Sequence, residues 1–135
     1  MRQHLLLLIG IAALTACSST EPTEKSNPNT MTVDFAWKPS HLCSGISPKV
    51  EIGNFPAGTS YFAVRLRDRD NPSSALGGGE VANTGSGVLP EGSLKSYTGP
   101  CTQGSEPHYY YFEAAAIDHD GKSIAYGKSQ PQPLP

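Results

Sequence analysis

The eight residues from position 61 read Tyr61-Phe62-Ala63-Val64-Arg65-Leu66-Arg67-Asp68. Every second residue from Phe62 to Leu66 is apolar and the positions between are small or charged, which predicts a β-strand with one core-facing side. Asp68 continues the core-facing row. A carboxylate there is costly unless it reaches the rim of the sheet or finds polar partners. We therefore expect Asp68 to be either a turn residue at the rim or part of a site.

The segment that follows this strand, Asp68-Arg69-Asp70-Asn71-Pro72, has the composition of a turn. Asp and Asn side chains accept hydrogen bonds from backbone N–H groups a few residues ahead and so close such turns. Taken alone, these residues favour the turn interpretation of Asp68 over the site interpretation.

Short strands separated by turn residues are expected on both sides of this stretch. Helical periodicity is absent after Met31, and strand patterns recur between glycine and proline residues. Further strands are predicted at 33–37, 49–53, 80–83, 108–118 and 123–128, with a loop at 84–92. The 108–118 stretch places His108 and Tyr110 on one face, and its three alanines leave a helix as the minority alternative. Six or so short strands predict an all-β fold, a β-sandwich.

The first seventeen residues have the pattern of a bacterial lipoprotein signal. Arg2 precedes an uncharged apolar run at 5–13 that is too short to cross a bilayer. Leu14-Thr15-Ala16-Cys17 resembles a lipobox, so we expect removal of residues 1–16 and acylation of Cys17; an ordinary secreted protein is the alternative. The expected location is the bacterial envelope. Ser18 favours the periplasmic side of the outer membrane if the cell is Gram-negative, because it is not the Asp that retains lipoproteins at the inner membrane.

Composition divides the mature chain into three parts. Residues 17–30 contain no large apolar side chain and are expected to form a flexible tether after the lipidated cysteine. Residues 31–128 suffice for one small β domain, and the proline-rich residues 129–135 are expected to be a frayed tail. The formal net charge is −2 and no basic patch stands out, which argues against a nucleic-acid partner. Membrane contact is expected through the lipid.

The cysteine count predicts one disulfide. If Cys17 carries the lipid, Cys43 and Cys101 remain as a pair in an oxidising compartment, and we expect them to be bonded. A metal site is the competing interpretation, but no Cys or His lies at a suitable spacing from either residue. No metal and no cofactor are therefore expected.

No common catalytic motif is present in the sequence. A nucleophile elbow, a phosphate-binding lysine after the glycines and a zinc-protease helix motif are all missing. The run Gly77-Gly78-Gly79 is interpreted as a place where backbones or a ligand approach closely. The sequence therefore predicts a protein that is not an enzyme.

Several short motifs occur in the order found in the phosphatidylethanolamine-binding protein family, also called Raf kinase inhibitor-like proteins, in its small bacterial form. They are Cys43-Ser44-Gly45-Ile46-Ser47-Pro48, Asp68-Arg69-Asp70-Asn71-Pro72, Tyr97-Thr98-Gly99-Pro100-Cys101 and Pro107-His108-Tyr109-Tyr110-Tyr111-Phe112. They resemble the family patterns C-x-G-x-x-S-P, D-P-D-A-P, Y-x-G-P-C and P-H-R-Y-x-F, the first with one residue missing. The resemblance covers residues about 31 to 128.

The resemblance implies a β-sandwich with a small anion pocket at one rim. Asp68 and Asp70 would form the acidic lip of this pocket, His108 and Tyr110 would donate to a phosphate-like group, and Pro100 would shape the wall. Gly78 stands where the family has a pocket histidine. Glu80, two residues on and on the same face by alternation, would place a negative charge near the pocket. The chain also ends short of the family's closing helix and strand.

Three functions are compared on this basis. The favoured one is a non-enzymatic envelope binding module with a remodelled pocket for a small anion, either phosphate-like or a phospholipid headgroup. The alternative is a module for an envelope protein partner, such as a protease inhibitor, with a vestigial pocket. A hydrolase using Asp68 or Glu80 with His108 ranks last.

Overall fold

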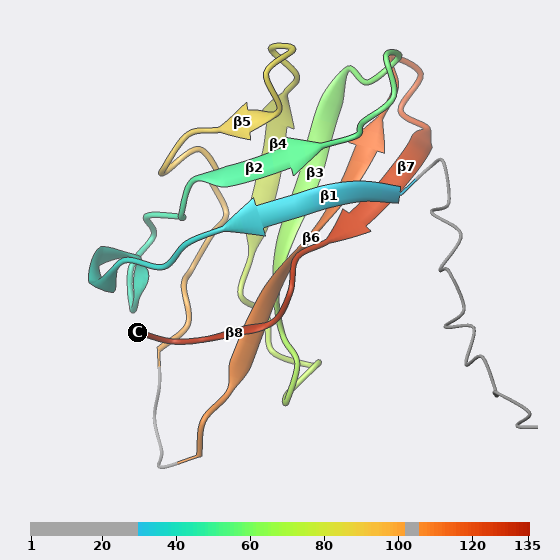
Figure 1. Ribbon diagram of the computed structural model, residues 1–135. Coiled ribbons are helices and arrows are strands. Elements are labelled where there is room, and N and C mark those ends of the chain that lie inside the picture. Colours follow the sequence, from blue (N-terminus) through green and yellow to red (C-terminus); the bar gives the residue numbers. More distant parts are fainter. Residues whose placement is uncertain (1–29, 102–105) are drawn as a thin grey trace, which may run out of the picture.

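The structure is a computed structural model that describes residues 30–101 and 106–135 (Figure 1). The predictions for the signal peptide, the tether and the lipidation of Cys17 concern residues outside these ranges. The described elements are, in chain order, β1 (Thr30–Phe35), a 3₁₀ turn η1 (Pro39–His41), β2 (Val50–Gly53), β3 (Tyr61–Asp68), β4 (Gly78–Ala82), β5 (Val88–Leu89), β6 (Tyr109–Ile117), β7 (Ser123–Lys128) and β8 (Gln132–Pro133). The predicted all-β class is confirmed, and β5 falls inside the stretch predicted to be a loop.

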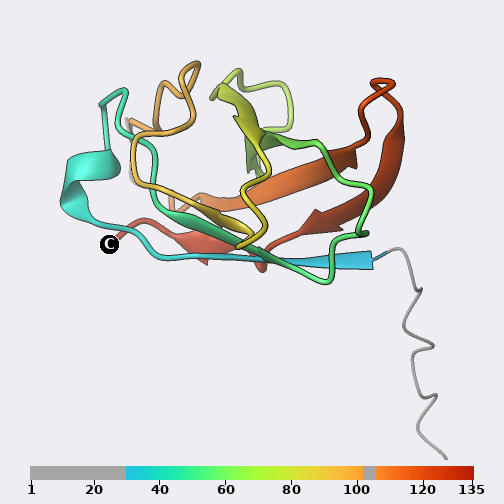
Figure 2. The same cartoon turned by 90° about the horizontal axis from the view of Figure 1, so that it is seen from above.

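The strands form two layers of one continuous sheet. Their order is β4-β3-β6-β7-β1-β2-β5, and β8 pairs with β6. The layers β4-β3-β6-β7 and β1-β2-β5 are joined by a short parallel contact in which Thr30 and Met31 pair with Tyr126 and Gly127. Figure 2 shows β1 (cyan) along the lower margin of the molecule and β6 (orange) above it. This is the predicted sandwich, with the sheet folded over its own core.

The core lies between the two layers and contains the apolar rows predicted from alternation. Its buried members are Met31, Val33, Phe35, Val50, Ile52, Phe62, Val64, Leu66, Leu89, Leu94, Tyr97, Tyr110, Phe112, Ala114, Ala116 and Ala125. Among the described residues, no helix is long and apolar enough to cross a membrane.

The β3–β6 pairing positions the residues of interest. The two strands are antiparallel neighbours over eight residue pairs, from Tyr61 opposite Ile117 to Asp68 opposite Tyr110. Directly paired residues share a face, so the end of the buried row of β3 meets the start of the buried row of β6. β6 lies in the middle of the sheet, between β3 and β7. Its alanines Ala114 and Ala116 face the core and are buried.

The C-terminal residues are not a frayed tail, and that prediction is wrong. β8 pairs with Tyr109 and Tyr110 of β6. Before it, the Ser129 hydroxyl accepts a hydrogen bond of 3.0 Å from the Phe112 N–H, and after it Leu134 packs on the core. Gln132 Nε2 donates to the Phe35 carbonyl oxygen at 3.0 Å, which ties this segment to the other layer. Pro133 is tolerated because β8 is an edge strand that needs few N–H donors.

The predicted Cys43–Cys101 disulfide is confirmed. Around it, the Cys43 N–H donates to the Pro100 carbonyl at 3.0 Å, and the Tyr97 hydroxyl donates to the His41 carbonyl at 2.8 Å. The disulfide therefore reinforces a contact between two loops that hydrogen bonds also hold.

The glycine run is a place of close backbone approach, as expected. A Cβ at Gly77 would lie 1.8 Å from the Ser96 carbonyl oxygen, and one at Gly78 would lie 2.0 Å from the Val64 carbonyl oxygen. No side chain fits at either position without moving the neighbouring backbone. The histidine that the family resemblance places at position 78 would have no room here.

Candidate functional site

Asp68 is the last residue of β3 and its carboxylate is buried, with 4% of the residue exposed. One oxygen, Oδ1, accepts hydrogen bonds from the backbone N–H groups of Asp70 at 2.8 Å and Asn71 at 3.0 Å. These bonds close the turn that was expected from the sequence. The carboxylate can be buried because its hydrogen-bonding capacity is used.

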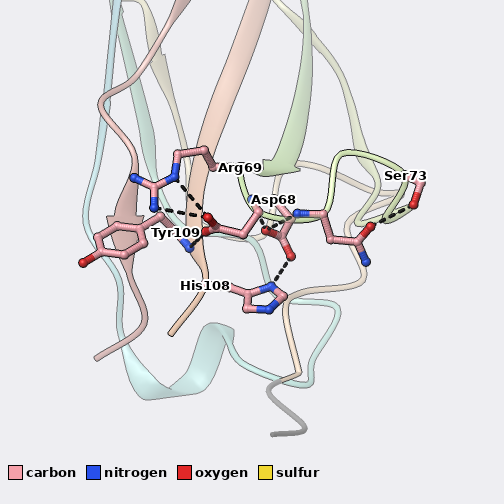
Figure 3. A network of polar contacts seen from close by, with 7 residues as sticks. Asp68, Arg69, Ser73, His108 and Tyr109 are labelled. Carbon is pink, nitrogen blue, oxygen red and sulfur yellow. Dashed lines mark hydrogen bonds and ion pairs between the residues drawn. The ribbon is translucent and has the colours of Figure 1, made fainter. Parts of the chain in front are cut away.

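The second oxygen of Asp68 contacts His108. The distance from Asp68 Oδ2 to His108 Nδ1 is 2.6 Å (Figure 3). The His108 side chain is 37% exposed. The hydrogen bond to Asp68 is the main cause that raises the pKa of His108 above its ordinary value, and the negative charges of Asp68, Asp70 and Glu106 raise it further. Asp68 therefore orients the imidazole and favours its charged form.

Asp70 is held by the first residue of β6, Tyr109, and by its own neighbour Arg69. Its Oδ2 accepts a hydrogen bond of 2.8 Å from the Tyr109 N–H, and this bond is the main cause that lowers the pKa of Asp70. Arg69 Nη2 lies 3.2 Å from Asp70 Oδ1, and the Arg69 guanidinium stands 4.1 Å from the centre of the Tyr109 ring. Figure 3 shows Arg69 and Tyr109 on one side of the cluster and His108 below Asp68.

An aromatic row continues from His108 into the protein. The rings of His108 and Tyr110 are stacked with centres 6.3 Å apart, and Trp37 meets Tyr110 edge to face at 6.3 Å. Tyr110 is 5% exposed, and burial raises the pKa of its hydroxyl. Trp37 Nε1 is buried and has no hydrogen-bond partner among the described residues. The Trp37 ring, which carries this unpaired donor, therefore packs against Tyr110.

The structure brings together four of the six ligand-binding residues predicted from the sequence. Asp68 and His108 are in contact, Asp70 is bonded to the backbone between His108 and Tyr110, and Tyr110 stacks on His108. Pro100 is fully buried beside the disulfide, where its carbonyl accepts the Cys43 N–H. Its role as a pocket wall stays a prediction.

Glu80 does not join the cluster, and its predicted position near the pocket is wrong. It pairs with Ala63, which lies on the outer face of β3, whereas Asp68 ends the buried row. The register also separates Ala63 from Asp68 by five positions along β3. The cluster therefore carries one carboxylate fewer than expected, which removes one source of repulsion toward an anion.

Three residues near the cluster were not among the predicted site residues. Arg69 and Trp37 contact it through Asp70 and Tyr110, and buried His41 lies beside Trp37 with ring centres 6.4 Å apart. Only Trp37 could have been found from the sequence, because it continues the apolar alternation of Val33 and Phe35 in the first strand. The other two depend on loop conformations that local patterns do not specify.

Among residues 30–101 and 106–135, no group of three or more His, Cys, Asp and Glu side chains is arranged to hold a metal ion. The arrangement of the cluster offers instead an imidazole fixed by a buried carboxylate, with aromatic rings beside it. Chemically this is suited to binding a small polar group through His108.

Comparisons with known proteins identify the fold. No protein-family model matches the sequence, and no curated protein is significantly similar to it in sequence. Escherichia coli YbcL, described as a new member of the mammalian phosphatidylethanolamine-binding protein (PEBP) family, superposes with a TM-score of 0.57 at 19% identity, over 77% of this chain and 97% of that one. CT736 of Chlamydia trachomatis, described as a PEBP homologue, superposes with a TM-score of 0.51 at 18% identity, over 74% and 94% of the two chains. The chain therefore has the PEBP-type fold, which confirms the resemblance at the level of the fold.

Proposed function

We propose that this chain of PEBP-type fold is a non-enzymatic binding module of the bacterial envelope, with a small-anion site around Asp68, Asp70, His108 and Tyr110. The observation that carries the proposal is the contact between buried Asp68 Oδ2 and His108 Nδ1 at 2.6 Å. A ligand of this site would carry a phosphate-like group, either free or as the headgroup of a phospholipid.

The contact with Asp68 decides what His108 offers to a ligand. An ionised carboxylate accepts the proton on Nδ1, which leaves Nε2 for the ligand. In the charged imidazolium Nε2 is a donor, and in the neutral ring it is an acceptor that repels an anionic oxygen. Because the raised pKa of His108 extends the charged form toward neutral pH, anion affinity is expected to be high below that pKa and to fall as pH rises through it.

The two carboxylates beside His108 are compatible with an anion because both are already engaged. Asp68 accepts two backbone N–H groups and the imidazole, and Asp70 accepts the Tyr109 N–H and pairs with Arg69. These contacts offset part of the negative field that a ligand would meet, and the charge of Glu106 adds to that field. Because Glu80 lies on the outer face, its negative charge does not add to the field at the site.

Calorimetric titration with inorganic phosphate and with phosphoethanolamine tests the proposal. The wild type should bind at least one of them, and His108→Ala should lose that binding. His119→Ala is the matched control, since the side chain of this histidine is 85% exposed in the turn between β6 and β7 and, among the described residues, its one ion pair is with its neighbour Asp120. Absence of binding in the wild type, or equal binding by the wild type and His108→Ala, would remove the anion site.

Two other functions are separated from this one by the same variants. A protein-partner or protease-inhibitor module predicts a partner that is retained from envelope extract when His108 is replaced. A hydrolase predicts turnover of phosphate or ester substrates, since an Asp–His pair of this geometry also occurs in general-base catalysis. A proposal of binding without catalysis requires that no such turnover be measured.

The envelope location is proposed from the signal sequence and is tested separately. Mass spectrometry of the mature protein should find residues 1–16 removed and Cys17 carrying acyl chains. Cys17→Ser should yield a protein that carries no acyl chains. An unmodified Cys17 would overturn the lipid anchor and leave the anion site untouched.

A further inference from the structure

The sheet β4-β3-β6-β7 has one face turned away from the core, and this outer face has an unusual composition. Four of the six tyrosines of the chain lie on it, together with three cationic side chains. These seven residues are Tyr61, Tyr109, Tyr111, Tyr126, Arg65, Arg67 and Lys128. Within the part of the chain that the structure describes, no other helix or strand packs on this face.

The charges of the outer face leave two cations available. Glu113 lies in one row between Arg65 on β3 and Lys128 on β7. Its carboxylate is occupied by Arg67 Nε at 2.6 Å and by the Tyr126 hydroxyl at 2.9 Å. In residues 30–101 and 106–135, Arg65 and Lys128 have no ion-pair partner, so both are free to meet an anionic surface. Besides Glu113, the opposing charge on this face is Glu80, at the edge strand β4.

The outer face lies where the N-terminal segment joins the domain. An open groove is lined by Thr30, Arg69, Tyr111, Tyr126, Lys128 and Pro131, so the first described residue and four side chains of the outer face or its rim share one hollow. Twelve residues, 18–29, separate Cys17 from Thr30. A flexible chain of that length has an average end-to-end distance of about 20 Å. A lipid on Cys17 would therefore hold this side of the domain close to the membrane.

We propose that the outer face is a membrane-docking surface that rests on anionic phospholipid headgroups, with Arg65 and Lys128 at the phosphates and the tyrosines at headgroup depth. Tyrosine places an apolar ring and a polar tip at such an interface, and each cation near an anionic membrane adds to binding. Tyr and Arg are also common in protein interfaces. The position of Thr30 favours the membrane, because the anchor proposed above brings this face to the bilayer first.

Sedimentation with vesicles tests the surface without help from the lipid, using the mature chain, residues 17–135, with Cys17→Ser. Vesicles of phosphatidylglycerol should bind the protein at low salt and release it as salt rises, and vesicles of phosphatidylcholine should not bind it. Arg65→Ala with Lys128→Ala should weaken binding about tenfold or more. Lys49→Ala with Lys95→Ala is the control, since it removes the same charge from exposed lysines that are not on the outer face.

Each outcome decides for or against the surface. Equal binding to the two lipids, no effect of salt, or equal losses in the two double variants would overturn it. The salt dependence of vesicle binding is measured with the outer face unsubstituted. It therefore remains a valid test even if a double variant is poorly folded. Loss of vesicle binding in His108→Ala, with Arg65→Ala and Lys128→Ala harmless, would assign the contact to headgroup capture by the anion site. Self-association in solution without vesicle binding would assign the face to a second copy.

Discussion

Replacing Asp68 tests how the turn and the candidate site are held together. In the wild type, Oδ1 accepts the N–H groups of Asp70 and Asn71 at 2.8 and 3.0 Å. A hydrogen bond to a charged acceptor contributes about 1.5–3 kcal/mol net, and the lower value applies here because both bonds are only partly buried. Asp68→Ala should therefore lower the free energy of unfolding by about 3 kcal/mol. Asp68→Asn keeps a neutral acceptor in the same place and should cost about 1 kcal/mol.

Urea denaturation followed by the fluorescence of Trp37 measures both changes, and Asp118→Ala is the matched control. Asp118 Oδ1 also accepts two backbone N–H groups, from Asp120 at 3.0 Å and Lys122 at 2.9 Å, but in an exposed turn. Its loss should cost only about 1 kcal/mol, since water can replace the lost acceptor. If Asp68→Asn costs as much as Asp68→Ala, or if the two alanine variants cost the same, burial of the Asp68 carboxylate is not what stabilises this turn.

Three further predictions concern the pH dependence, the C-terminal segment and the glycine run. The pKa of His108 in the folded protein lies above its ordinary 6.5, so its contribution to stability is complete below pH 6.5 and is lost as pH rises through the folded pKa. Melting temperatures should fall over this pH range. The variant His108→Gln should show a smaller fall. Ser129→Ala leaves the buried Phe112 N–H without its acceptor and should cost about 1–3 kcal/mol in chemical denaturation, whereas no effect would mean that the segment is frayed after all. Gly78→Ala should cost about 3 kcal/mol because its Cβ would strike the backbone of β3, and Gly58→Ala, whose Cβ would meet only a side chain at 3.9 Å, should be nearly neutral.

The alternation of apolar residues predicted the parts of the fold that local physics determines. The bounds of β3 and β7 agree with the predicted strands at 61–68 and 123–128. The same parity placed Asp68 at the end of a buried row, as the structure has it. The sequence posed the turn and the site as alternatives, but one carboxylate oxygen closes the turn and the other contacts His108. The sequence pattern assigns one role to each residue and does not show that the two oxygens of one carboxylate have different partners.

The errors have a common cause, which is that they depend on pairing between distant segments. Alternation correctly put Gly78 and Glu80 on one face, but only the β3–β4 register shows that this is the outer face. The C-terminal segment looked disordered because its prolines and glutamines have no strand pattern. Its order comes from Ser129 and Gln132, which bind backbone atoms of Phe112 and Phe35 far away in the sequence.

Strand β6 connects the two proposals, because successive residues of a strand point to opposite faces. His108 and Tyr110 belong to the candidate anion site, and Tyr109 and Tyr111 belong to the outer face. Arg69 lies between the two, since it pairs with Asp70 and also lines the groove beside Thr30. A domain resting on its outer face would therefore hold the rim that carries His108 near the headgroups. The two functions can still be separated, because changes at Arg65 and Lys128 alter the outer face without touching the partners of His108. If both proposals are right, the outer-face variant should reduce vesicle binding while its affinity for soluble phosphate stays that of the wild type.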